Sequence, residues 1–351
     1  MIKYLQITGL NGLDKPLEFE FNDDLNLFTG LNGCGKTTIL KILWFINSGH
    51  FFHLLNEVDF HSLDLKTDKY TVSLIKEGAV AHITWKIGSI DKHDDISLME
   101  GVHRRSSNDY SVELYEKSDE SLFFPTFRRI EGGFFIENNR YRRTPFPLKS
   151  ALSDLSDELS TPKHKFVSYV STDDITLLIN REYSTVVREI NELQKSKFVA
   201  IRERIKHKKG KNSESILQEI EADITDVENN SEEKLLPFST LEKLILSIFR
   251  KKGIEMDAFI FGDLENAISS EKLSAGEKQM LSFLCYNTFS KNKIIFIDEP
   301  ELSLHPDWQR LLIPTLLKQG NNNQFFIATH SPFIYTKYAD KEIILSEDKG
   351  E

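Results

Sequence analysis

The sequence is poor in cysteine, with two cysteines among 351 residues. Two thiols cannot build the disulfide framework that holds many small secreted domains, so we expect a reduced, cytoplasmic protein. No apolar run approaches the ~20 residues of a membrane-spanning helix. The first residues, MIKY, also lack the charged-then-apolar plan of a signal peptide. These absences argue against a secreted disulfide-rich protein and against an integral membrane protein.

Positive charge is in the minority, with 44 Lys and Arg against 54 Asp and Glu and a formal net charge of −10. A surface of this sign disfavours non-specific binding of nucleic acid, so such binding requires a local basic patch. Two segments offer one. The run from Lys206 to Lys211 is basic, and the aromatic-rich stretch 125–150 contains Arg128, Arg129, Arg140, Arg142 and Arg143. The simpler interpretation is a solvated turn in the first and arginine–carboxylate pairs in the second, with nucleic-acid contact as the alternative.

What the sequence does contain is a glycine-rich turn at residues 30–38, GLNGCGKTT. It matches G-x-x-x-x-G-K-[ST], the pattern of a phosphate-binding loop. An apolar run before it predicts a strand at 25–28, and apolar residues at helical spacing after it predict a helix at 36–46. Backbone N–H groups at such a turn wrap an anion where the helix dipole also favours it. We therefore predict a nucleotide triphosphate site, with Lys36 on the phosphates and the Thr37 hydroxyl on Mg²⁺.

Two later segments fit a cycle of nucleotide hydrolysis. Ser274 and Glu277 have the spacing of a capping box at the start of an apolar helix, and a helix N-terminus is itself a site for anions. Further on, the apolar run 294–297 predicts a buried strand that ends in Asp298 and Glu299. A carboxylate at the end of such a strand supplies the second half of a Mg²⁺ site. The next carboxylate is placed to orient the attacking water.

The rest of the chain divides into a β-rich first part, a helical middle and a final α/β part. We place the boundaries at 1–172, 173–235 and 236–351. The middle part is expected to hold two charged amphipathic helices joined by the basic turn, a hairpin that resembles a short coiled coil. A separate helix is expected at 235–249. Polar connections are expected at 47–68 and 88–110, and a short strand or a buried turn at 259–261. Strands are expected at 2–7, 17–21, 70–75, 79–87, 112–115, 122–124, 166–170 and 325–328.

In their order, the motifs GLNGCGKTT, LSAGEKQ, IIFIDEPELSLHP and IATHSP resemble an ABC-type ATPase head of the SMC, RecF and OLD group. The resemblance is greatest to compact bacterial members, AAA-family ATP-binding proteins of anti-phage defence or genome maintenance. It covers residues 1–40 and 270–335, while the middle matches only as a helical insert. It implies an α/β fold, a P-loop NTPase mixed sheet with a β-rich N-terminal lobe and a helical-hairpin insertion.

The resemblance also implies roles for individual residues. Lys36, Glu299 and His330 would form the catalytic set, with Glu299 as base and His330 as the switch histidine that senses the γ-phosphate. Thr37 and Asp298 would hold Mg²⁺. ATP would be bound by Asn32, Gly33, Cys34, Gly35, Lys36, Thr37 and Thr38, and by the signature residues Ser274, Gly276 and Glu277. Ser303 and His305 fall in the segment that communicates across the dimer in this group.

In these proteins the signature of one head completes the site of the other. One set of motifs per chain therefore implies at least a homodimer with two ATP molecules between its heads. One feature departs from the pattern, because ABC heads usually carry a glutamine after a strand between the phosphate loop and the insert. This sequence has no glutamine between Gln6 and Gln194. The equivalent loop is either 125–131 or 171–174, which leaves an Arg, a Thr or an Asp as the substitute.

Three functions fit this resemblance. The first is an ATPase that senses a trigger and regulates a separately encoded effector, a nuclease, in anti-phage defence. It is favoured because the sequence ends soon after His330, leaving no room for the nuclease domain that OLD proteins append. The second is a DNA-repair or chromosome-maintenance clamp of RecF or SMC type, which would bind DNA through the basic segments. The third, a transporter's nucleotide-binding subunit, is disfavoured by the long insert and by the segment ELSLHP.

Overall fold

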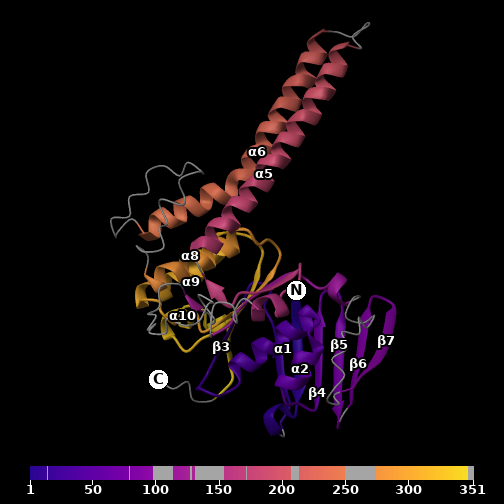
Figure 1. Ribbon diagram of the computed structural model, residues 1–351, viewed down its shortest axis with the longest axis vertical. Coiled ribbons are helices and arrows are strands. Elements are labelled where there is room, and N and C mark those ends of the chain that lie inside the picture. The colour runs from indigo at the N-terminus through magenta and orange to yellow at the C-terminus, as the bar shows by residue number, and fades with distance from the viewer. Residues whose placement is uncertain are drawn as a thin grey trace, which may run out of the picture. The chain divides into compact units, whose positions relative to one another are not determined.

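The computed structural model describes residues 1–13, 15–78, 80–97, 114–126, 129–130, 154–170, 172–206, 213–249 and 274–346 (Figure 1). The chain forms two compact units. Unit 1 comprises residues 1–170, 290–314 and 320–351, and unit 2 comprises residues 171–289 and 315–319. The chain thus leaves unit 1 once for a long excursion and then returns to it. The three-part division predicted above stays a prediction.

The centre of unit 1 is a six-stranded sheet in the order β10-β8-β12-β13-β3-β14. Each neighbouring pair is parallel. The inner strands are buried along their whole length, as expected when both faces of a parallel sheet are covered. The six strands are β3 (Leu25–Thr29), β8 (Ser121–Phe124), β10 (His164–Phe166), β12 (Ile294–Asp298), β13 (Gln324–Ala328) and β14 (Glu342–Ile344).

Helix α1 (Lys36–Ser48) contacts β8, β12 and β13 of this sheet. Its apolar residues are almost fully buried, and Trp44 packs on Phe123 with ring centroids 5.3 Å apart. Phenylalanines continue the core across the strands, since Phe296 and Phe326 stack at 5.2 Å. The helix ends at Gly49, whose φ of 75° is the left-handed conformation that closes many helices. The core therefore fixes α1 against the strands that carry the candidate site.

The β-rich lobe is a second, antiparallel sheet of six strands in the order β2-β1-β4-β5-β6-β7. Burial alternates along β5 and β6, which buries Val72, Leu74, Ile83 and Trp85 on one face. The predicted hairpin between these two strands is confirmed, and Gly78 lies in its turn with a φ of 60°. The strands are β1 (Ile2–Thr8), β2 (Leu17–Glu20), β4 (Ser62–Thr67), β5 (Thr71–Glu77), β6 (Val80–Ile87) and β7 (Ile90–Ser97).

Several predictions of local structure are wrong. The connection expected at 47–68 contains helix α2 (Phe51–Glu57) and strand β4, because Phe51, Leu54 and Leu55 form a short apolar face amid polar residues. The loop expected at 88–110 begins with β7, an edge strand whose residues are almost all exposed. Backbone hydrogen bonds to β6 hold this strand in place. It therefore forms without the alternation of apolar residues that would have predicted it from the sequence.

Three further differences concern the middle of the chain. Residues 114–117 are helical, so the strand expected at 112–115 is wrong there. The strand expected at 166–170 is instead two short strands, β10 and β11 (Tyr169–Val170), the second paired with β9 (Arg129–Ile130). The short strand or buried turn expected at 259–261 lies outside the described residues.

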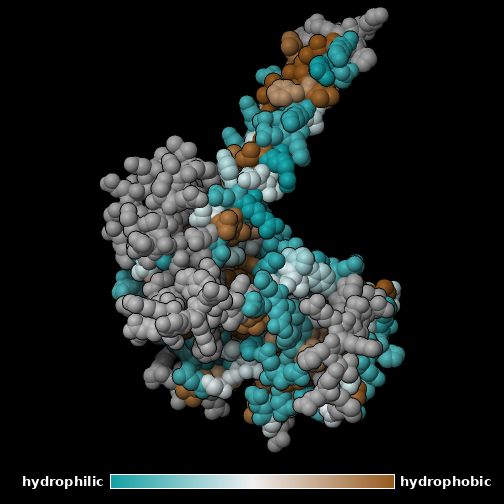
Figure 2. Space-filling view, in the orientation of Figure 1, coloured by the Kyte–Doolittle hydropathy of each residue, from teal (hydrophilic) through white to brown (hydrophobic). Residues whose placement is uncertain are grey.

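Unit 2 is helical, and its main feature is the predicted hairpin (Figure 1). Helices α5 (Thr172–Lys206) and α6 (Ser213–Phe249) run antiparallel, and ion pairs cross between them. Lys197 contacts Asp223 at 3.0 Å, and Lys234 contacts Glu189 at 2.6 Å. Near the outer end several large apolar side chains are exposed (Figure 2): Phe198, Val199, Ile205, Leu217 and Ile224.

Helix α6 continues to Phe249, so the separate helix expected at 235–249 is wrong. Pro237 lies inside it, where a proline removes one backbone hydrogen bond. The buried residues Phe238, Leu241 and Ile245 follow directly, and Phe238 packs on Tyr183 and Phe289. Their packing holds the helix together across the proline. Within the described part of the chain, no helix is both long and apolar enough to cross a membrane.

The buried histidines of unit 1 predict a sensitivity to acid. Burial lowers the pKa of His164 to about 3 and that of His50 to about 4. An unfolded histidine takes up its proton near pH 6.5. The unfolded state therefore binds more protons below that pH, and the stability present above pH 6.5 is lost as the pH falls.

We expect His164→Gln, which keeps groups able to bond Ser118 and Ser121, to lose less stability than wild type between pH 6.5 and 5. The difference should be about 2 kcal/mol in the free energy of unfolding measured with urea. His93→Gln on the exposed strand β7 is the control and should follow wild type. Identical pH slopes for His164→Gln and wild type would show that His164 does not contribute.

Candidate functional site

The candidate site lies at the edge where the parallel strands of unit 1 end. Ile297 lies opposite both Phe124 and Ile327, and Ala328 lies opposite Phe28. In an open α/β sheet, ligands bind outside the carboxyl ends of the strands. The residues at or just after the carboxyl ends of β3, β8, β12 and β13 therefore meet at one edge. They include Gly30, Thr126, Asp298, Glu299 and His330.

The phosphate loop connects β3 to α1, as predicted. Gly30, Gly33 and Gly35 have φ values of 136°, 80° and 99°, a region that favours glycine. At Gly30 a side chain would also collide, since an added Cβ would lie 2.7 Å from Ser346 Oγ. Gly35 caps α1 without a side-chain hydrogen bond. The helix N-terminus is thus without a side-chain cap of its own, the arrangement that binds an anion.

Lys36 is buried beneath this loop. Its ammonium group donates hydrogen bonds to the carbonyl oxygens of Gly30 and Leu31, both at 2.9 Å. The same Nζ lies 3.7 Å from Cys34 Sγ and 3.4 Å from His330 Nδ1. Two elements far apart in sequence, the phosphate loop and the end of β13, therefore meet at Lys36.

Asp298 and Thr37 are also in contact. The Thr37 hydroxyl donates a hydrogen bond to Asp298 Oδ1 at 3.1 Å, and Asp298 is 1% exposed. The other carboxylate oxygen, Oδ2, accepts a hydrogen bond from the Thr126 hydroxyl. Carboxylate and hydroxyl oxygens are hard ligands of the kind that Mg²⁺ prefers.

Among the described residues no three His, Cys, Asp or Glu side chains gather as a metal site. A Mg²⁺ site at Asp298 would therefore be of the sparse kind, which takes one or two carboxylates and fills its shell with water and phosphate oxygens.

Glu299 follows Asp298 in an unusual backbone conformation. Its φ is 47°, the left-handed region that costs energy for a residue with a side chain. Its N–H donates to the carbonyl of Ala328 at 2.9 Å, which anchors the turn to β13. Its Oε1 lies 3.7 Å from His330 Nε2. The strained turn therefore brings the proposed base beside the proposed switch histidine.

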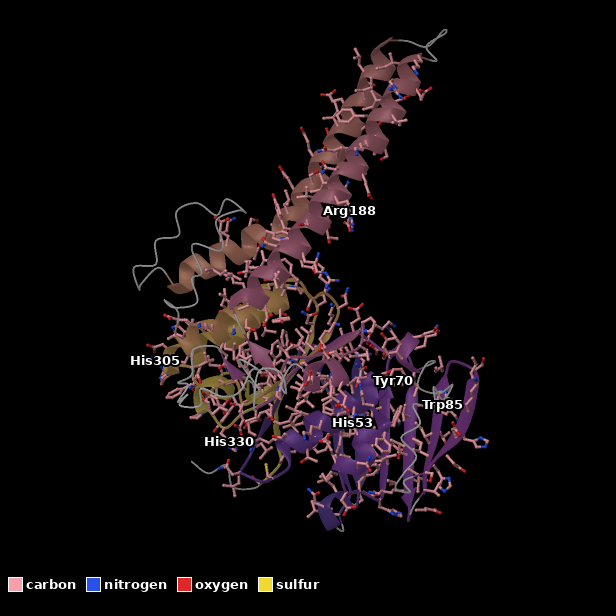
Figure 3. All side chains as sticks on the ribbon, viewed as in Figure 1. His53, Tyr70, Trp85, Arg188, His305 and His330 are labelled. Atoms are coloured by element: carbon pink, nitrogen blue, oxygen red, sulfur yellow. The ribbon has the colours of Figure 1, made fainter. Side chains whose placement is uncertain are left out.

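His330, labelled in Figure 3, lies between charges of both signs. Burial lowers its pKa below the usual 6.5, and the Lys36 charge acts in the same direction, while Glu301 and Asp298 oppose them. The net lowering keeps the imidazole neutral at pH 7. A neutral imidazole has one acceptor nitrogen and one donor nitrogen. Nδ1 can therefore accept a hydrogen bond from the Lys36 ammonium, while the N–H at Nε2 donates to a carboxylate or phosphate oxygen on the other side.

Sequence reasoning missed Glu301. Its Oε1 accepts a hydrogen bond from the His330 backbone N–H at 2.5 Å, and its Oε2 accepts one from the Thr329 hydroxyl at 2.9 Å. Gln309 makes a second tie, accepting from the Ser331 hydroxyl at 2.5 Å. In the sequence, Glu301 is only the last acid of the run DEPE. The direction in which its side chain points depends on the backbone turn at Glu299. The sequence therefore carried no signal that singled it out.

The signature residues belong to unit 2, at the start of α8 (Ala275–Thr288). The capping box is confirmed, because the Glu277 N–H donates to Ser274 Oγ at 3.4 Å and the Ser274 N–H donates to Glu277 Oε2 at 2.7 Å. Gly276 and Glu277 are buried. Ser303 and His305 are exposed in the segment after β12, and Ser303 has a φ of 70°.

The candidate nucleic-acid segments fall largely outside the described residues. Arg128 and the residues 131–150 are among them, as are 207–212 of the basic turn. Arg129 is described only as part of strand β9. Lys206 ends α5, where it contacts Glu203 at 3.1 Å. Both segments stay predictions.

The chain is similar in sequence to known proteins. The chain is 24% identical to endonuclease GajA of Bacillus cereus (strain VD045) over 329 residues, which cover 88% of the chain and 52% of that protein. It is 23% identical to the retron Vc95 probable ATPase of Vibrio cholerae serotype O1 biovar El Tor over 364 residues, 90% of the chain and 68% of that protein. The chain thus spans about half the length of the first relative and about two thirds of the second.

Among solved structures, the Smc head domain of Pyrococcus furiosus bound to the C-terminal domain of ScpA matches 95% of this chain and 91% of its own. Its TM-score is 0.40 at 14% identity. The Smc head domain of Pyrococcus yayanosii covers 99% and 95%, with a TM-score of 0.42 at 12% identity. A family model described as AAA ATPase domain matches residues 1–335. With nearly its whole length inside that match, and with a phosphate loop, Asp298 and Glu299 at one sheet edge, the chain belongs to the AAA ATPase domain family.

Proposed function

We propose that this protein binds ATP with Mg²⁺ and hydrolyses it. The observation that carries the proposal is the convergence of Lys36, Thr37, Asp298, Glu299 and His330 at one edge of the sheet. These residues follow three different strands, and no local sequence pattern would bring them together. The family supports the reaction class, and the arrangement supports the assignment of the individual roles.

Binding falls to the phosphate loop. Its backbone N–H groups and the N-terminus of α1 would surround the phosphates, with Lys36 turning from its carbonyl partners toward them. Thr37 and Asp298 would hold Mg²⁺, which neutralises charge on the β- and γ-oxygens when it is bound. The remaining predicted ATP contacts are Asn32, Gly33, Cys34, Gly35 and Thr38.

Hydrolysis falls to Glu299 and His330. A carboxylate beside the γ-phosphate orients and polarises the attacking water, and Glu299 is the acid that the turn after β12 directs toward His330. The neutral His330 would donate a hydrogen bond to the γ-phosphate. Lys36, 3.4 Å from His330, would stabilise the same charge.

The third part of the proposal is a homodimer that forms on ATP. Each chain carries one phosphate loop and one signature helix, so two-fold symmetry would offer each site the α8 N-terminus of the other copy. ATP would then hold the heads together until hydrolysis removes the bridge.

We further propose that this cytoplasmic cycle regulates a separate effector, a nuclease, in anti-phage defence. One relative is named an endonuclease and another a retron probable ATPase. The effector is tested by affinity purification from the native operon, with the mass of the complex measured with and without ATP. Co-purification of an effector, without stimulation of the ATPase by DNA, supports the sensor. Stimulation by DNA that falls with salt would replace it with the DNA clamp.

Glu299→Gln tests the base. The variant should bind ATP like wild type but turn over ~10²–10⁴-fold more slowly, because an amide cannot take a proton from water. ATP should also shift it toward dimers, which light scattering measures. Glu116→Gln, an exposed acid of the same unit, is the control. An unchanged turnover number in Glu299→Gln would refute the role of base.

Ser274→Arg tests the shared site. The variant should bind ATP, because the phosphate loop is untouched, but it should neither dimerise nor hydrolyse. Ser274→Ala removes the cap alone, at about 1 kcal/mol of stability, and controls for damage to α8.

Mixing the Ser274→Arg and Glu299→Gln variants tests the shared site directly. A heterodimer of Ser274→Arg and Glu299→Gln contains one intact composite site, so two inactive proteins should regain turnover together. Activity that stays absent in the mixture, although heterodimers form, would mean that the sites are not shared.

Glu301→Ala tests the tie to His330. Removing both acceptors leaves the His330 N–H and the Thr329 hydroxyl to find other partners, so the imidazole should shift. We expect kcat to fall at least about tenfold, with the affinity for ATP within about twofold of wild type. Glu301→Gln, which keeps one acceptor, should recover part of the rate. Asp307→Asn, a nearby exposed carboxylate, is the control. Equal rates for Glu301→Ala and wild type would contradict the role.

A further inference from the structure

Thr126 lies beside Asp298 because of strand register. Strand β8 runs parallel to β12 with Phe124 opposite Ile297, so the residues that follow both strands reach the same edge. Asp298 is the last residue of β12, and Thr126 comes two residues after β8 ends. The Thr126 hydroxyl donates a hydrogen bond to Asp298 Oδ2.

The two oxygens of Asp298 are therefore held by two different threonines. Thr37 at the start of α1 donates to Oδ1, and Thr126 donates to Oδ2. The carboxylate is buried, and the two hydrogen bonds together fix the plane of the group. A carboxylate oxygen has two lone pairs, so each can accept a hydroxyl and still face a cation or its water.

We propose that Thr126 is a positioning residue of the Mg²⁺ site, holding Asp298 in the orientation that receives the ion. This rests on the proposed function, because the site must first take Mg²⁺ with ATP. It also bears on the missing glutamine, because Thr126 belongs to the candidate loop 125–131 and contacts Asp298 through a hydroxyl rather than an amide.

The geometry separates two effects of removing this hydroxyl. The Thr126 hydroxyl contacts Asp298, whereas the Lys36 ammonium contacts the carbonyls of Gly30 and Leu31 in the phosphate loop, so nucleotide binding without metal should not depend on Thr126. The orientation of Asp298 should depend on it, because without Thr126 its Oδ2 would lose a hydroxyl donor while Oδ1 keeps the hydrogen bond from Thr37. Residues that orient a metal ligand typically contribute 10–100-fold to metal affinity.

The test is a Mg²⁺ titration of a fluorescent, non-hydrolysable ATP analogue bound to the full chain. Thr126→Val, which has nearly the same shape, should bind the analogue in EDTA within about twofold of wild type. Its Mg²⁺ concentration at half-saturation should rise at least about tenfold, and Thr126→Ser should restore it. Thr185→Val on α5, which also removes a donating hydroxyl, is the matched control.

A half-saturation that is the same in Thr126→Val and wild type would overturn the proposal. Should Thr126→Val be unstable, Thr126→Ala and Thr126→Ser in the same titration decide, since only the alanine variant should weaken the response to Mg²⁺. Failure of the proposed function is distinguishable, because the wild type itself would then bind no analogue or show no response to Mg²⁺.

Discussion

The structure depends on a buried carboxylate at the end of β12. A charge that is 1% exposed is costly unless hydrogen bonds satisfy it, and Asp298 accepts one from the Thr37 hydroxyl at 3.1 Å. That contact joins the N-terminus of α1 to the edge of the sheet. The positive end of the helix dipole lies there, so the N-terminus that would attract a phosphate also stabilises the Asp298 carboxylate. The proposed binding of a cation and of phosphate would thus depend on this one junction.

The register of the parallel strands brings further residues to this junction and so completes the candidate site. Because the strands are parallel, a shift of one pairing would move Asp298, Thr126 and His330 out of line with each other. The packing of Phe296 against Phe326 and of Trp44 against Phe123 in the core stabilises that register. The strained conformation of Glu299 is maintained by the hydrogen bond from its N–H to the carbonyl of Ala328, so strand β13 of the sheet supports this turn.

Features with a local physical signature could be predicted from the sequence. The phosphate loop needs glycines at fixed places, the capping box needs Ser and Glu three residues apart, and β12 is a plain apolar run. Features that depend on distant packing could not. Strand β7 is specified by its neighbour β6, and α6 crosses Pro237 because Phe238 is buried against Tyr183 and Phe289. Thr126 and Glu301 belong to the second kind, since each is defined by a partner more than twenty residues away.

The start of α8 shows how the proposed dimer would use a helix N-terminus that is already capped. The capping box occupies the N–H groups of Ser274 and Glu277 and places a carboxylate at the positive end of the helix. A phosphate approaching this end would meet that negative charge, so the dipole alone is a weak attraction. The N–H groups of Ala275 and Gly276 lie between the two members of the box, and of these two residues Ala275 is exposed while Gly276 is buried. Recognition of ATP by the second copy would therefore rest on directed hydrogen bonds from this short backbone segment, which demand exact placement and which a displaced head cannot supply.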